Sequence, residues 1–247
     1  MPHAEHLVWI RNNMRYIFLL FLTIFLVNEA DAASRLEQLY LESQLINNYS
    51  DDLYINGNDF VIGKEDAEIT VVEFFDYNCG YCERALADLI KLIDSNPNIK
   101  VVLKEYPILN DNSYDLAKLS LSAGLQGKYF EFHSILLSTK GTVSYDQALK
   151  IAADIGLDIL KLEDDFKSQQ VNDIIANTKV LGYSLAVSGT PAYFVGDIKL
   201  AGAVGYETLQ EVVNYITEGI SIDDYIVQLA QAGDSDAYKV MVRYGLY

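Results

Sequence analysis

Residues 70–90 read TVVEFFDYNCGYCERALADLI and contain both cysteines of the chain, Cys79 and Cys82. The β-branched and aromatic residues at 70–75 predict a strand, and the residues after the second cysteine predict a helix. Cys79 would then lie at a helix N-terminus, where free N–H groups and the helix dipole stabilise a thiolate, the species that attacks a disulfide. Because the two cysteines would close only a very small loop, a structural disulfide is a poor explanation, and the pair indicates a redox centre.

A zinc site and a pair of inert core cysteines are the alternatives. Zinc takes about four ligands, but His3 and His6 fall in a segment that we predict to be removed, which leaves His133 as the remaining histidine. Free cysteines are commonly buried and inert, but the intervening glycine and the strand-to-helix junction favour a reactive pair. The sequence therefore predicts no metal and no cofactor.

The first 32 residues have the features of a secretory signal peptide. Arg11 and Arg15 precede a short apolar stretch at 16–27, and the Ala-Asp-Ala at 30–32 fits a cleavage site. The apolar stretch is shorter than the roughly 20 residues that span a bilayer, although an uncleaved anchor is the alternative. Met14 is an alternative to Met1 as the start. Export would place the cysteines in an oxidising compartment.

The chain of 247 residues carries 18 Lys and Arg against 35 Asp and Glu, a net charge of −17. A surface this acidic repels phosphate backbones, which argues against nucleic-acid binding. The residues after position 32 suffice for one large domain, or for a core domain with an insertion.

Apolar spacing predicts a regular order of helices and strands along the mature chain. A helix over 34–50, with Ser34 as its N-cap, precedes a βαβ unit whose two strands would be parallel. A helical block follows from about residue 113 to 185, and then a hairpin that turns at Gly196-Asp197. The predicted strands are 60–62, 69–75, 100–104, 192–195 and 198–202; the predicted helices are 82–94, 114–125, 129–137, 145–155, 160–184 and 206–218, with a helical tail at 222–247.

Ser188-Gly189-Thr190-Pro191 opens the hairpin. A proline at the start of a strand cannot donate to the ladder, so it belongs where the strand edge stays open. Combined with the upstream cysteine pair, this position predicts that the Thr190–Pro191 bond is cis and lies beside the cysteines.

Together, the stretch from Glu73 to Cys82, the helical block and Gly189-Thr190-Pro191 resemble the DsbA-like family of periplasmic thiol:disulfide oxidoreductases. The resemblance implies an α/β fold, namely a thioredoxin-like fold with a helical insertion between the βαβ half and the cis-proline hairpin half. The expected organisation is a signal peptide at 1–32, an N-terminal helical segment at 33–57, a DsbA-like thioredoxin domain at 58–218 with the insertion at about 110–186, and a C-terminal helical tail at 219–247.

The resemblance also implies roles for individual residues. Cys79 would be the exposed nucleophile and Cys82 the buried resolving thiol, and Pro191 would be the cis-proline. Substrate would bind at Gly80, Tyr81, Thr190 and Pro191. Gly80-Tyr81 resembles the dipeptide of DsbC-type isomerases, as does the threonine before the proline, whereas the strong oxidases commonly carry Pro-His.

Glu73 is an acidic residue on an otherwise apolar strand. Burial would raise its pKa and suit it to accept a proton from Cys82, and the family has an acidic residue at this position. Lys104, at the end of the next strand, is a candidate partner for Glu73, with a solvated strand end as the alternative. His133 is expected to pack or to face solvent rather than to catalyse.

The predicted function is therefore a protein disulfide oxidoreductase of the periplasm that forms or isomerises disulfides through a mixed disulfide. The alternative is a non-catalytic surface or binding protein that retains the fold. The expected partners are unfolded or misfolded exported proteins and a membrane redox protein that is DsbB-like or DsbD-like. The apolar stripe at 34–50 needs a partner, which would be the core of the same chain or a second copy in a homodimer.

Overall fold

The computed structural model describes residues 29–55, 59–64 and 66–246, so most of the predicted signal peptide lies outside the described residues. The chain divides into two compact units. Of the described residues, one unit comprises those from Glu29 to Leu41 together with those from Gln210 onward, and the other comprises those within Glu42–Leu209. Within the described ranges, no helix is long and apolar enough to cross a membrane.

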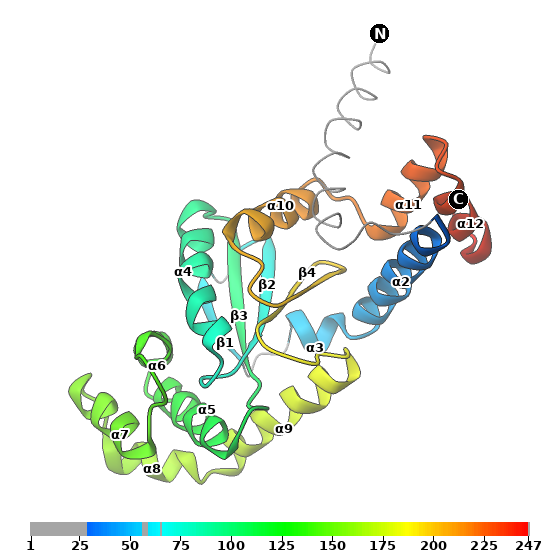
Figure 1. Cartoon of the computed structure of the whole chain (residues 1–247). Coiled ribbons are helices and arrows are strands. Elements are labelled where there is room, and N and C mark those ends of the chain that lie inside the picture. Colours follow the sequence, from blue (N-terminus) through cyan, green and yellow to red (C-terminus); the bar gives the residue numbers. More distant parts are fainter. Residues whose placement is uncertain (1–28, 56–58, 65, 247) are drawn as a thin grey trace. The chain divides into compact units, whose positions relative to one another are not determined.

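The larger unit is built on a five-stranded sheet with the order β1-β3-β2-β4-β5 (Figure 1). As predicted, β2 and β3 are parallel, whereas β1 is antiparallel to β3 and β4 is antiparallel to β2 and β5. The hairpin turn also lies where the sequence places it. The strands are β1 (Phe60–Gly63), β2 (Ile69–Phe75), β3 (Ile99–Glu105), β4 (Ala192–Val195) and β5 (Ile198–Ala201).

Alternate residues of β2 face opposite sides of the sheet. Val72 and Phe74 belong to a core cluster that includes Ile46 of α2 (Glu29–Asn48), Leu53 of α3 (Ser50–Tyr54) and Leu181 of α9 (Gln169–Ser184). Glu73 has the opposite orientation, on the face that carries α4 (Gly80–Ser95) and the cysteines. The sheet thus separates an apolar packing face from a face that holds the candidate site.

Five helices form the insertion between β3 and β4, which confirms the predicted thioredoxin-like architecture. Helix α5 contacts each of the other four, and the group lies beside one end of the sheet (Figure 1). These helices are α5 (Asp111–Gly124), α6 (Tyr129–Ser138), α7 (Tyr145–Asp154), α8 (Ile159–Phe166) and α9.

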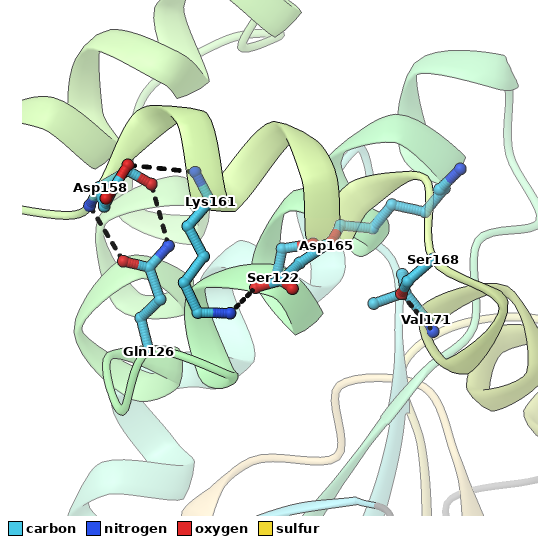
Figure 2. Close-up of polar contacts among 8 residues, drawn as sticks. Ser122, Gln126, Asp158, Lys161, Asp165, Ser168 and Val171 are labelled. Carbon is cyan, nitrogen blue, oxygen red and sulfur yellow. Dashed lines mark hydrogen bonds and ion pairs between the residues drawn. The ribbon is translucent and has the colours of Figure 1, made fainter.

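The prediction of one helix over residues 160–184 is wrong. The chain breaks after α8, and Ser168 caps a new helix by accepting a hydrogen bond at Oγ from the Val171 amide (3.2 Å; Figure 2). Serine binds nearby backbone groups and is favoured at an N-cap over a helix interior. The start of α8 is fixed by Asp158, whose backbone N–H and C=O both bind the Gln126 side chain (2.9 and 3.1 Å; Figure 2).

Helix α2 begins at Glu29, so Ser34 lies inside the helix and is not its N-cap. The alanine-rich sequence before Ser34 has high helix propensity, which extends the helix toward the N-terminus. Ile46 near its C-terminal end is 1% exposed in the core of the larger unit, so the chain itself buries this part of the apolar stripe.

The smaller unit contains the first part of α2 and the helices that follow the thioredoxin core. Glu37 accepts hydrogen bonds from Arg243 Nη1 (2.7 Å) and Tyr244 Oη (2.6 Å), which ties α2 to the last helix. The helices of this region are α10 (Tyr206–Thr217), which begins in the larger unit, α11 (Ile222–Gln231) and α12 (Ser235–Tyr244).

Lys104 does not pair with Glu73, contrary to that expectation. In the parallel register Lys104 lies opposite Phe74, and Glu73 lies opposite Leu103, so the two charged side chains are on different faces of the sheet. Lys104 is 1% exposed and binds Asp59 Oδ2 (2.5 Å) and the Asp52 carbonyl (2.9 Å). Its role is to join β3 to the segment around β1.

We expect Lys104→Met to lower the free energy of unfolding by about 3–5 kcal/mol, because it leaves the buried Asp59 carboxylate unpaired. Burial already holds the pKa of Asp59 above its usual value, and loss of Lys104 raises it further. The folded variant therefore binds the Asp59 proton more tightly than the unfolded chain does. Its loss of unfolding free energy, relative to the wild type, consequently grows as the pH rises. Urea unfolding at pH 5 and pH 8 measures both effects.

Lys161→Met is the matched control, because the Lys161 side chain is 51% exposed and its ion pair with Asp165 (drawn in Figure 2) should contribute about 0.3–0.5 kcal/mol. Equal losses in the two variants would show that the Lys104 pair is not an important buried contact.

Candidate active site

The cysteine pair lies at the N-terminus of α4, as the sequence predicts. Cys79 is the N-cap, with extended backbone angles (φ −91°, ψ 106°), and its Sγ accepts a hydrogen bond from the Cys82 amide (3.4 Å). The Cys79 carbonyl accepts from the amides of Cys82 (2.9 Å) and Glu83 (3.1 Å). The first turn of the helix therefore directs its free N–H groups at the Cys79 sulfur.

The two thiols have opposite acidities. The pKa of Cys79 is lowered to about 6, first by a hydrogen bond from the Cys82 thiol and also by the amides of Cys82 and Tyr81. Burial raises the pKa of Cys82. Cys79 is only 7% exposed and Cys82 is 1% exposed, so Cys79 is the more accessible thiol but is less exposed than the resemblance implied.

The Thr190–Pro191 peptide bond is cis and lies beside the cysteines, as predicted. The Thr190 carbonyl oxygen is 3.1 Å from Cys79 Sγ and accepts from the protonated thiol. The Pro191 carbonyl accepts from the Gly202 amide (2.8 Å), which ties the start of β4 to the end of β5. The structure thus brings together Cys79 and a backbone segment 111 positions away.

Gly80 and Tyr81 form the exposed rim of the site. Tyr81 is 60% exposed, and the Arg84 guanidinium lies 4.4 Å from the centre of its ring. A side chain at position 80 would meet only the end of Arg84, and one at Gly189 would meet nothing within 4 Å. The backbone at Gly80 and at Gly189 is therefore not crowded by neighbouring atoms.

Glu73 is buried behind the cysteines, with 2% of its surface exposed. Burial raises its pKa to about 8, a hydrogen bond from Tyr193 opposes this increase, and negative charge on Cys79 adds to it. The carboxyl group in turn raises the pKa of Cys82. Glu73 is therefore close enough to both cysteines to respond to their charge.

Asp76 is a residue of the site that the sequence reasoning missed. Its Oδ1 accepts from the Asn78 amide (2.8 Å) and from Ser113 Oγ (2.7 Å). Its Oδ2 accepts from the amides of Ile108 (2.9 Å) and Leu109 (3.0 Å). A charged residue directly after an apolar strand and three positions before the first cysteine was the available signal.

Tyr77 leads into a second buried network behind the loop. Its hydroxyl lies 3.0 Å from Glu105 Oε1, 2.5 Å from Ser120 Oγ and 3.0 Å from His133 Nδ1. Tyr129 donates to the same Glu105 oxygen (2.7 Å). Burial lowers the pKa of His133 to about 3, so this histidine is a neutral packing residue, in agreement with the sequence-based expectation.

The sheet order, the helical insertion and the cysteine pair beside a cis-proline define a thioredoxin-like fold. A family model described as a DSBA-like thioredoxin domain matches residues 70–214, more than half of the chain, and the chain belongs to this family.

Two solved structures are similar over most of the described chain. A thioredoxin-like oxidoreductase from Silicibacter pomeroyi DSS-3 is 38% identical with a TM-score of 0.67, covering 68% of this chain and 97% of that one. The thiol-disulfide exchange protein alpha-DsbA2 from Wolbachia pipientis is 30% identical with a TM-score of 0.69, covering 72% and 97%.

Among curated proteins, the Na(+)/H(+) antiporter NhaA 1 of Salinispora arenicola is 31% identical over 158 residues, which are 63% of this chain and 24% of that protein. The chain thus spans about a quarter of the length of the antiporter relatives that it matches.

We expect the Cys79 thiolate to form with a midpoint near pH 6, measured by ultraviolet absorbance of the reduced protein. Cys82→Ala should raise this pKa, because the variant loses the S–H donor that has the largest effect. Ser120→Ala, which changes the network behind the loop but leaves the thiols untouched, is the control. A wild-type midpoint near 8.5, the value of a free cysteine, would contradict the assignment.

Proposed function

We propose that this chain is a thiol:disulfide oxidoreductase that acts on exported polypeptides through Cys79 and Cys82. The observation that carries the proposal is the position of Cys79 at the N-terminus of α4, with its sulfur 3.1 Å from the Thr190 carbonyl. A nucleophilic sulfur beside an open backbone segment suits attack on a disulfide in an extended polypeptide. Membership of the DSBA-like family supports the same activity.

In the first step, the Cys79 thiolate attacks one sulfur of a substrate disulfide. A bond forms between Cys79 and that sulfur, the substrate S–S bond breaks, and the other substrate sulfur leaves as a thiolate. The exposed Gly80 and Tyr81, together with the partly buried Thr190, would hold the substrate during this exchange. Pro191 has no backbone N–H, so it cannot donate an inter-strand hydrogen bond at the start of β4.

In the second step, Cys82 resolves the mixed disulfide. Its S–H proton moves to the Glu73 carboxylate, and the Cys82 sulfur forms a bond with Cys79. The bond between Cys79 and the substrate then breaks, and the substrate sulfur leaves as a thiolate. Run in reverse, the same steps oxidise a substrate dithiol, with Glu73 returning the proton to the Cys82 thiolate.

Oxidase, isomerase and reductase roles use the same residues and differ in redox poise. The in vivo redox state of the cysteine pair distinguishes them: a mostly oxidised pair indicates an oxidase fed by a DsbB-like membrane partner, and a mostly reduced pair indicates an isomerase or reductase supplied by a DsbD-like one. The proposed location is the periplasm, after removal of the signal peptide.

A homodimer is a separate proposal. Because Ile46 and Leu53 belong to the core of the larger unit, deletion of this segment would disturb the fold rather than an interface alone. Light scattering on the mature chain, over a range of concentrations, is therefore the appropriate test.

We expect reduced wild-type protein to release thionitrobenzoate in two phases from one equivalent of dithiobis(nitrobenzoate). The first phase reports attack by Cys79 and the second reports resolution by Cys82. Cys79→Ser should abolish both phases and insulin reduction, whereas Cys82→Ser should retain the first phase and accumulate mixed disulfides. A wild-type protein that shows no second phase and no insulin reduction would indicate the non-catalytic binding protein instead.

In the same assay, Glu73→Gln should slow the second phase by up to about 100-fold and leave the first phase nearly unchanged, because glutamine cannot accept the Cys82 proton. Gln147→Glu, a change on the exposed start of α7, is a control for altered charge. Equal slowing of both phases by Glu73→Gln would show that Glu73 supports the fold and does not accept the proton.

A further inference from the structure

Tyr193 lies directly beside Glu73 in the sheet. The two residues are register partners on β4 and β2, so their side chains point to the same face, toward α4. Tyr193 is 1% exposed and Glu73 is 2% exposed, and the tyrosine hydroxyl donates a hydrogen bond to the carboxyl group. The proposed mechanism assigns no role to this tyrosine, although it follows Pro191 by only two positions.

We propose that Tyr193 is a positioning residue that orients the Glu73 carboxyl group toward Cys82 and stabilises its ionised form for proton transfer. This inference rests on the proposed function, because it concerns the step in which Cys82 resolves the mixed disulfide. Tyr193 retains its own proton throughout. The proton that moves is that of Cys82, and Glu73 later releases it to water.

A hydroxyl donor stabilises a carboxylate more than it stabilises a neutral carboxyl group. In this site the effect opposes burial, which raises the pKa of Glu73. The titratable groups that act on Glu73 are Tyr193 from β4 and the two cysteines from α4, whereas β3 presents the apolar Leu103. Tyr193 is therefore the group that increases the fraction of Glu73 able to accept a proton.

Tyr193 is suited to donate and not to ionise. Burial and the negative charges of Glu73 and Cys82 raise its pKa, and Asp88 on α4 adds to the effect. The phenol consequently remains protonated at any pH at which Cys82 reacts. Because β4 begins directly after Pro191, the strand that lies beside Cys79 also delivers the hydroxyl to Glu73.

The test is the pH profile of the second phase of thionitrobenzoate release. In the wild type the rate of this phase should rise with pH to a midpoint where Glu73 ionises, which lies below about 8 because the mixed disulfide has removed the negative charge of Cys79. Tyr193→Phe keeps the ring but removes the donor, so the midpoint should move upward by about one pH unit. Below both midpoints this shift slows the second phase about tenfold, while the first phase changes little.

Tyr106→Phe is the matched control. Its hydroxyl is also buried, but it donates to the Val187 carbonyl on the opposite face of the sheet, so the profile should stay at the wild-type midpoint. Glu73→Gln should remove the midpoint altogether. A Tyr193→Phe protein with native circular dichroism and an unshifted profile would overturn the inference.

If Tyr193→Phe does not fold, 3-fluorotyrosine placed at position 193 preserves the packing and makes the hydroxyl a stronger donor. The midpoint should then move downward, and an unchanged midpoint would overturn the inference. Failure of the proposed function gives a different result, because a wild-type protein with no second phase has no profile to shift.

Discussion

The S–H group of Cys82 and the backbone amides at the start of α4 converge on one sulfur atom, that of Cys79. This convergence separates two chemically identical side chains, because it stabilises negative charge on Cys79 and leaves Cys82 buried and protonated. The helix N-terminus supplies part of the effect, and it exists only because β2 ends at Phe75 and the chain then turns directly into the helix. The strand, the turn and the helix N-terminus together therefore determine the acidity of Cys79.

The charge on Cys79 also affects Glu73. Negative charge on Cys79 raises the pKa of the Glu73 carboxyl, so a free thiolate favours a protonated Glu73. When Cys79 enters a mixed disulfide its charge is lost, and Glu73 then ionises more readily. At that stage Cys82 must lose its proton. The first step would therefore favour the ionised Glu73 carboxylate just when a proton acceptor is needed.

The sequence predicts much of this arrangement because the relevant signals are local. Strand β2, helix α4 and the hairpin after Pro191 each follow from a short pattern of apolar and turn residues, and Glu73 is recognisable as a charge on an apolar strand. The predicted pairing of Lys104 with Glu73 was wrong because it depends on the register between β2 and β3. A one-residue difference in register moves a side chain to the other face of the sheet.

Tyr193 was missed for a related reason. A tyrosine in an apolar strand is typical of a core residue. Only the register between β4 and β2 shows that this tyrosine lies beside Glu73. The break between α8 and α9 depends on whether Ser168 caps a helix or continues one, which apolar spacing alone does not distinguish.

Asp76 explains why the helical insertion belongs to the site and is not a peripheral addition. Its carboxylate binds the loop that leads into Cys79, the backbone of Ile108 and Leu109, and Ser113 at the start of α5. Leu109 is 51% exposed, so the same buried carboxylate that fixes the active-site loop also fixes an apolar side chain at the surface. Since each of its oxygens has two donors, movement of the insertion would break bonds to the cysteine loop. Tyr77 adds a second link from the same loop to α5, because its hydroxyl lies 2.5 Å from Ser120 Oγ. The loop that carries Cys79 and the helical insertion are therefore held together by buried polar contacts along the first three turns of α5.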